Sequence, residues 1–98
     1  VAKTRPTQKH DATTIRGMAN TDISAEQLAV RHILADNVRR LRTELGWSQE
    51  ELAFECNLHR TFVAHVEREA RNISIDNITK IAGALGVTVY QLLLPSDE

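Results

Sequence analysis

Between residues 25 and 46, apolar side chains recur at the spacing of a helix. They are Leu34, Val38, Leu41 and Leu45. Steps of four, three and four residues place these side chains on one face, which predicts an amphipathic helix that begins near Ala25. Gly46 is expected to end this helix, because glycine readily takes the left-handed conformation that closes a helix.

Two shorter helices follow, and polar residues mark their ends. Ser48 lies three residues before Glu51, so each side chain can accept a hydrogen bond from an unpaired backbone N–H at a helix start. The inward-facing residues of the helix that begins there are Leu52, Ala53 and Cys56. Asn57 can take the left-handed conformation that ends it, and a third helix is predicted over about residues 60–68.

Two further helices are predicted before Pro95, which forbids continuation of the last one. Ser74 is the expected N-cap of the fourth helix, and Gly86 is expected to close it. The apolar residues of this helix are Ile75, Ile78, Ile81, Ala82 and Leu85. Thr88 is the expected N-cap of the fifth. The pattern contains five helices and no strand, so the predicted fold class is all-α.

The composition restricts the class of protein. A chain of 98 residues with 42% apolar residues can close one small core, which argues against a two-domain enzyme. Lys and Arg number 12 against 13 Asp and Glu, so the formal net charge is −1 and the chain is no polybasic binder. The single cysteine cannot form an internal disulfide, and no apolar run is long enough to cross a bilayer. We therefore expect a cytoplasmic protein without membrane contact.

Residues 1–24 follow neither the helical nor the strand period and contain Pro6 and Gly17. This pattern predicts a flexible N-terminal arm, followed by one folded domain over residues 25–98. The arm is interpreted as a solvated tail, and contact of its weakly basic residues with a polyanion is the alternative. Met18 is an alternative natural start of the chain.

The second and third helices, joined by a three- or four-residue turn, are typical of a helix-turn-helix. Val63 and Val66 lie on one side of the third helix. The residues of the opposite side are Arg60, Thr61, Ala64, His65 and Arg68. This outer side has several hydrogen-bond donors and no acid, so it can lie in a DNA major groove and donate to base edges. An ordinary solvated helix face is the alternative interpretation.

Five runs of residues form one longer pattern over residues 33–94. They are Asn37-Val38-Arg39-Arg40-Leu41-Arg42, Gly46-Trp47-Ser48-Gln49-Glu50-Glu51-Leu52-Ala53, Leu58-His59-Arg60-Thr61-Phe62-Val63, Val66-Glu67-Arg68 and Ile81-Ala82-Gly83-Ala84-Leu85-Gly86-Val87. This pattern resembles the phage-repressor and Cro type of helix-turn-helix, the Xre family. The resemblance implies a compact five-helix, lambda-repressor-like DNA-binding domain. Between Arg60 and Ile75 the sequence is most similar to the controller proteins of restriction-modification systems.

The resemblance also implies roles for individual residues. The base-reading positions are matched by Arg60, Thr61 and His65, with Ala64 among them on the same side. Gln49 matches a glutamine that contacts a backbone phosphate, and the helix N-terminus at this position favours an anion. The positions after the third helix that are expected to contact DNA backbone or bases are Arg68, Arg71 and Asn72. Arg42 and Glu67 match an ion pair that links the first helix to the third.

Two positions depart from the family pattern. His59 stands where the family usually has Ser or Thr as the cap of the recognition helix, so we expect a poorer cap. Glu69 stands where the family often has Gly, which leaves the conformation of the following loop open.

Two other residues, His10 and His32, have no visible partner in the sequence.

Cys56, His59 and His65 are close enough in sequence to be considered as metal ligands. A zinc site needs four convergent ligands, and neither CxxC nor HExxH spacing is present. Cys56 is predicted to be a small buried residue instead. Because no phosphate-binding glycine loop, catalytic triad or carboxylate pair can be built, we expect no enzyme activity, no metal and no cofactor.

Leu92, Leu93 and Leu94 are consecutive, so they cannot all point into one small core. The surplus apolar surface predicts a partner, which the resemblance implies to be a second copy of the chain. The predicted dimer interface consists of Val89, Leu92 and Leu94. C-terminal fraying with a buried Leu92 is the alternative.

The sequence therefore predicts a homodimeric regulator of transcription that binds a short palindromic operator in double-stranded DNA. A controller of a restriction-modification system is one specific form of this function. The alternative is an antitoxin or adaptor whose main role is to bind a protein such as a toxin or a polymerase subunit. We expect no small-molecule inducer, because 98 residues leave no room for a separate sensor domain.

Overall fold

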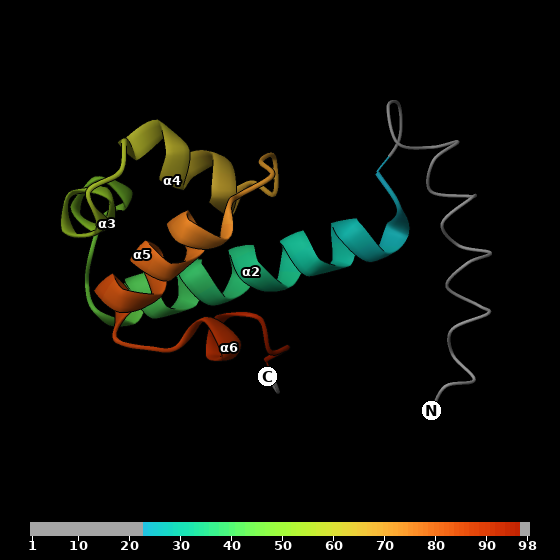
Figure 1. The fold of residues 1–98 in the computed structure, drawn as a ribbon. Helices are drawn as coiled ribbons and strands as arrows, with labels where there is room; N and C mark the ends of the chain where they lie inside the picture. Colours follow the sequence, from blue (N-terminus) through green and yellow to red (C-terminus); the bar gives the residue numbers. More distant parts are fainter. Residues whose placement is uncertain (1–22, 97–98) are drawn as a thin grey trace.

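The computed structural model describes residues 23–96, and this range contains five helices and no strand (Figure 1). The helices are α2 (Ala25–Glu44), α3 (Gln49–Cys56), α4 (Arg60–Glu67), α5 (Ile75–Leu85) and α6 (Val89–Leu92). The predicted all-α class and the five predicted helices are confirmed. Of the predicted arm only Ile23 and Ser24 are described, and Met18 and His10 lie outside the described residues.

The helices begin where polar side chains can pair with the first backbone N–H groups. Ser48, Ser74 and Thr88 each accept a hydrogen bond from the N–H three residues later, at 3.0, 3.1 and 3.0 Å, as predicted. Ser24 does the same for α2 through the N–H of Gln27, a cap that was not predicted from the sequence. The caps explain why each helix starts where it does, since an uncapped first turn leaves its N–H groups unpaired.

Four residues in the described range have a positive φ, and each one closes a helix. They are Gly46, Asn57, Glu69 and Gly86, with φ of 78°, 59°, 62° and 78°. In every case the N–H of this residue donates to the carbonyl three residues earlier, and the next N–H donates to the carbonyl five residues earlier. This is the Schellman motif, which pairs the last carbonyls of a helix. Gly46, Asn57 and Gly86 close their helices as predicted.

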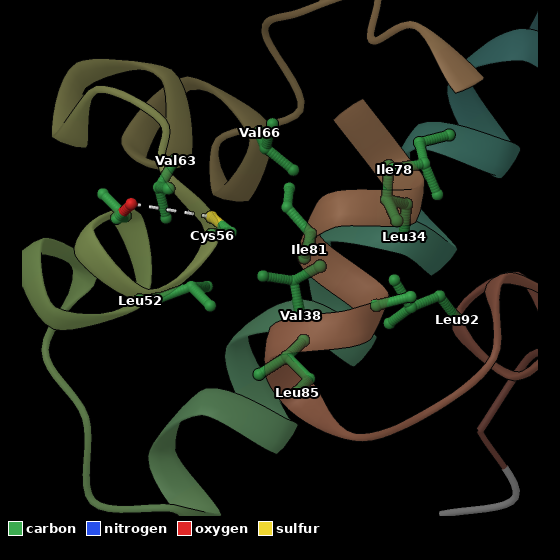
Figure 2. Close-up of a cluster of buried hydrophobic side chains, with 12 residues drawn as sticks. Leu34, Val38, Leu52, Cys56, Val63, Val66, Ile78, Ile81, Leu85 and Leu92 are labelled. Carbon is green, nitrogen blue, oxygen red and sulfur yellow. Dashed lines mark hydrogen bonds between the residues drawn. The ribbon is translucent and has the colours of Figure 1, made fainter. Parts of the chain in front are cut away.

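One hydrophobic core joins all five helices (Figure 2). Each helix contributes at least one large side chain with no exposed surface, and these are Val38, Leu52, Val63, Ile81 and Leu92. Cys56 is buried in the same core, as predicted. Full burial of one such aliphatic side chain contributes about 1.5–3 kcal/mol, so this shared core stabilises helices too short to persist alone.

Helices α4, α5 and α6 pack along α2, whereas α3 packs against α4 and α5 (Figure 1). Helix α4 packs against both α2 and α3, and α6 packs against α2 and α5. The first six residues of α2 are exposed and extend beyond the remaining helices. No helix within residues 23–96 has the length and apolar character needed to span a membrane.

Two residues near α2 depart from the predicted pattern. Leu45, predicted on the apolar face, is exposed because α2 ends at Glu44 and Leu45 lies in the closing turn. Asn37 is buried instead, and its Nδ2 donates to the carbonyl oxygens of Leu92 and Leu94, both at 2.8 Å. This amide ties the C-terminal segment to α2, although its partners lie 55 and 57 residues away in the sequence.

Candidate nucleic-acid interface

Helix α4 has an apolar inner side and a polar outer side. Val63 and Val66 are buried in the core, as their spacing predicted. The outer residues are Arg60, Thr61 and Arg68, which are exposed, and Ala64 and His65, which are partly exposed. Glu67, the single acid of this helix, is buried. The outer side of α4 therefore presents hydrogen-bond donors and no carboxylate.

His59 caps the N-terminus of α4. Its Nδ1 accepts a hydrogen bond from the N–H of Thr61 at 3.0 Å. Although Ser or Thr is the usual cap, an unprotonated imidazole nitrogen is an acceptor and takes the place of the hydroxyl oxygen. The cap secures the first turn of α4, where Arg60 and Thr61 are located.

Glu67 is held by side chains from two other helices. Arg42 of α2 donates through Nε to Oε2 at 2.6 Å and through Nη2 to Oε1 at 2.9 Å. Gln49 of α3 donates through Nε2 to Oε1 at 3.0 Å, and Arg39 donates to the backbone carbonyl of Glu67. The pair of Arg42 and Glu67 is thus present, while the contact of Gln49 with Glu67 was not predicted.

The pair of Arg42 and Glu67 is largely removed from water, with side chains 13% and 3% exposed. The hydrogen bonds that Arg42 donates to the Glu67 carboxylate raise the pKa of the guanidinium, so this group stays charged at any physiological pH. Nη1 of Arg42 also donates to the carbonyl of Trp47 at 2.7 Å. One guanidinium therefore orients α4 relative to α2 and secures the turn that leads into α3.

The loop between α4 and α5 carries the other residues predicted to contact DNA. Arg68, Arg71 and Asn72 are all exposed. The guanidinium carbon of Arg71 lies 4.6 Å from the centroid of the Phe62 ring, a cation–π contact that was not predicted from the sequence. This contact keeps Arg71 beside α4 rather than free in solvent.

Glu69 settles the loop conformation that the sequence left open. It closes α4 with a left-handed backbone, and its Oε2 lies 2.9 Å from Nδ1 of His32 in α2. The expectation that His32 has no partner is therefore wrong, because its partner lies 37 residues away and leaves no local signal. Glu69 raises the pKa of His32, first through the hydrogen bond and then through its charge, while Asp36 adds to this effect and Arg39 opposes it.

Of the predicted dimer residues, Val89 and Leu92 lie in α6 and Leu94 follows it. Leu92 has no exposed surface because the core takes its side chain, so for this residue the prediction is wrong. Val89 is only partly buried against the core and stays a predicted dimer contact. Leu94 is exposed, and so are Tyr90 of α6 and Leu93, which follows this helix.

Cys56, His59 and His65 were considered as metal ligands, and their surroundings give them other roles. Burial raises the pKa of the Cys56 thiol, which disfavours the thiolate that a metal needs. The ring of His59 is engaged as a helix cap. Within the part of the chain that the structure describes, no three His, Cys, Asp or Glu side chains are grouped so that they could hold a metal ion.

Comparison with known proteins identifies the family. Residues 38–92, more than half of the chain, match the helix-turn-helix family. The chain belongs to the helix-turn-helix family. In this motif the second helix is the recognition helix, which here is α4, and α3 precedes it.

Relatives of this helix-turn-helix chain include regulators from several bacteria. The "Neisseria hypothetical transcription factor" of Neisseria meningitidis is 56% identical over 69 residues, which cover 70% of this chain and 65% of that protein. Control protein C.BamHI of Bacillus amyloliquefaciens is 49% identical over 65 residues, which cover 65% of this chain and 80% of that protein. The chain thus spans less than two-thirds of the Neisseria relative.

Among solved structures, the restriction-modification controller protein C.AhdI from Aeromonas hydrophila superposes with a TM-score of 0.63 at 44% identity. The superposition covers 65% of this chain and 97% of the controller protein. The predicted resemblance to Xre-type helix-turn-helix proteins, and to restriction-modification controllers among them, is confirmed.

Proposed function

We propose that this helix-turn-helix protein is a sequence-specific, DNA-binding regulator of transcription that acts in the cytoplasm. The outer side of α4 carries the proposal, because Arg60, Thr61 and His65 are accessible there. Glu67 is turned into the core and paired with Arg42. An exposed carboxylate would be repelled by the phosphates on either side of a groove, so burial of the single acid of α4 suits the helix to DNA.

Each polar residue has a distinct role in this proposal. Arg60 donates to guanine O6 and N7, and Thr61 contacts a base edge or a thymine methyl group. Gln49 and the N-terminus of α3 contact a backbone phosphate, and the hydrogen bond from Gln49 to Glu67 holds its side chain in place. The exposed residues of the loop after α4 contact the backbone beyond the recognition helix, and these are Arg68, Arg71 and Asn72.

Selection of bound sequences from a random pool of duplexes tests the function directly. One enriched motif is expected, whereas a pool without a motif contradicts the proposal and favours the antitoxin or adaptor alternative. Arg60→Ala should then weaken binding to the selected duplex by about 1–3 kcal/mol and relax the preference at one base pair. The exposed Lys80→Ala is the charge-matched control for Arg60→Ala, and Gln49→Ala should weaken binding to all duplexes alike.

We also propose that two copies of the chain bind a palindromic site. The supporting surface consists of three exposed residues in α6 and just after it, Tyr90, Leu93 and Leu94, and Asn37 holds this segment in place. A dimer formed there would present two α4 helices about 34 Å apart, one turn of DNA. Leu94→Glu should halve the mass in sedimentation analysis, and Phe54→Glu, at another exposed apolar residue, should not. An unchanged mass for Leu94→Glu contradicts the dimer.

The specific role proposed is control of a restriction-modification system. It is supported by the similarity to control protein C.BamHI and to the restriction-modification controller C.AhdI. The DNA that flanks the gene should then encode an endonuclease and a methyltransferase. If a motif is selected but no endonuclease or methyltransferase gene flanks this one, the protein regulates other genes and the restriction-modification role is contradicted.

A further inference from the structure

The turn that closes α4 contains Glu69 in the left-handed backbone conformation, which is unfavourable for glutamate. The other three closing turns use Gly46, Asn57 and Gly86, residue types that enter the left-handed region readily. Glu69 has no such freedom, and the left-handed conformation of a residue of this type is disfavoured roughly tenfold. Strained residues of this kind persist where surrounding contacts hold them, and they gather at functional sites.

The contact that holds Glu69 comes from α2. Oε2 of Glu69 and Nδ1 of His32 are 2.9 Å apart, and the two side chains are 34% and 68% exposed. The charged groups that act on His32 are Glu69 from the loop and Asp36 and Arg39 from its own helix. Glycine at position 69 would close the turn without strain, but it could not reach His32.

The tie to α2 lies beside the residues proposed to contact DNA. Arg68 immediately precedes Glu69, and Arg71 follows it by two residues. Arg39 of α2 donates to the backbone carbonyl of Glu67, two residues before Glu69. The end of α4 and the start of the loop are thus attached to α2 at two successive points.

We propose that His32 is a positioning residue for DNA binding, because its pairing with Glu69 holds the loop after α4 in the conformation that places Arg68 and Arg71 at the DNA backbone. This inference rests on the proposed DNA-binding function and adds control by protons to it. Protonated His32 binds the carboxylate as an ion pair, whereas neutral His32 retains only a hydrogen bond. Affinity for DNA therefore decreases as the pH rises through the raised pKa of His32.

The main test is a double-mutant cycle at about pH 6 and about pH 8.5, on either side of the imidazole titration. Fluorescence anisotropy with the selected duplex compares the wild type with His32→Gln, Glu69→Gln and the double variant. The coupling between the two positions should be about threefold in affinity at the lower pH and near one at the higher pH, the scale of an exposed ion pair. Additive effects at both pH values overturn the proposal.

The cycle removes the contribution of other histidines. His59 and His65 lie at α4 and are present in all four proteins, so any effect they have is common to the cycle and does not enter the coupling between positions 32 and 69. Asp36→Asn is the matched control, because it removes an acid beside His32 without altering the loop. The coupling should persist in this background.

Two further measurements separate the pair from the proposed function. NMR titration of the protein alone should show the His32 pKa falling to its ordinary value in Glu69→Gln, and an unchanged titration overturns the pair whether or not DNA binds. Glu69→Gly should raise the melting temperature, because it relieves the left-handed strain, and yet weaken DNA binding at the lower pH. If Glu69→Gly binds the selected duplex as tightly as the wild type at both pH values, the positioning role is overturned while the DNA-binding function stands.

Discussion

Two glutamates at the end of α4 attach it to α2 in different ways. Glu67 is buried and accepts hydrogen bonds from Arg42 and Gln49. Glu69 is partly exposed, and its side chain contacts a largely exposed His32. Burial makes the first attachment strong and indispensable, because an unpaired buried charge is costly. Solvent makes the second attachment weak and lets protons control it, although the residue type and the partner helix are the same.

The largest effect is expected at the buried attachment. Glu67→Ala leaves the Arg42 guanidinium without its partner and should lower the free energy of unfolding by about 3–5 kcal/mol. Arg42→Ala should do the same, and the double variant should lose less than the sum of the two. Urea unfolding of the four proteins measures the coupling. A coupling energy near zero between Arg42 and Glu67 would mean that this buried pair is no stronger than the exposed pair of His32 and Glu69.

A smaller loss is expected when Gln49 is removed. Gln49→Leu deletes the hydrogen bond to the carboxylate of Glu67 and should lower the free energy of unfolding by about 1–2 kcal/mol. The effect should vanish in the Glu67→Ala background, which separates it from lost helix capping or packing. His32→Gln, at the exposed attachment, should cost less than Gln49→Leu in the same denaturation assay.

The exposed attachment should respond to glycine with a gain in stability. Glu69→Gly removes a strained left-handed residue and should raise the free energy of unfolding by up to about 1 kcal/mol. Gly86→Ala is the control of opposite sign, because φ is +78° there and no atom lies within 4 Å of an added Cβ. The loss of stability in Gly86→Ala should therefore come from the unfavourable backbone conformation alone. A loss of stability in Glu69→Gly would show that the contact with His32 outweighs the strain.

The smallest effect is the pH dependence of stability from the exposed pair. The pKa of His32 is raised in the folded protein, so its pairing with Glu69 contributes fully below the ordinary imidazole value. The contribution is lost as the pH rises through the raised pKa. The difference in unfolding midpoint between wild type and His32→Gln should shrink over that interval. In Glu69→Gln the same difference should be flat with pH, since no carboxylate remains to pair.

Local signals in the sequence were sufficient for the helices and their ends. The Ser48 cap and the Asn57 turn were predicted correctly, because each depends on residues within one or two turns of helix. The two sides of α4 followed from helical period alone. The pair of Arg42 and Glu67 came from the family resemblance, and the structure adds Gln49 to it.

Contacts between distant segments gave no such signal. The partners of His32 and Asn37 lie 37 and 55 residues away, so neither contact could be found from neighbouring residues. The consecutive leucines at the C-terminus indicated surplus apolar surface, but not which of them the core would take. Only the packing of α6 against α2 and α5 decided that Leu92 turns inward while Leu94 stays exposed.

The amino-acid sequence alone determined five helices, their boundaries and the polar side of the recognition helix, because period and capping act over a few residues. The tertiary structure decided which charges meet. It turned Glu67 into the core, brought Glu69 to His32 and chose the exposed side of α6, since each of these depends on how helices remote in sequence pack around one small core.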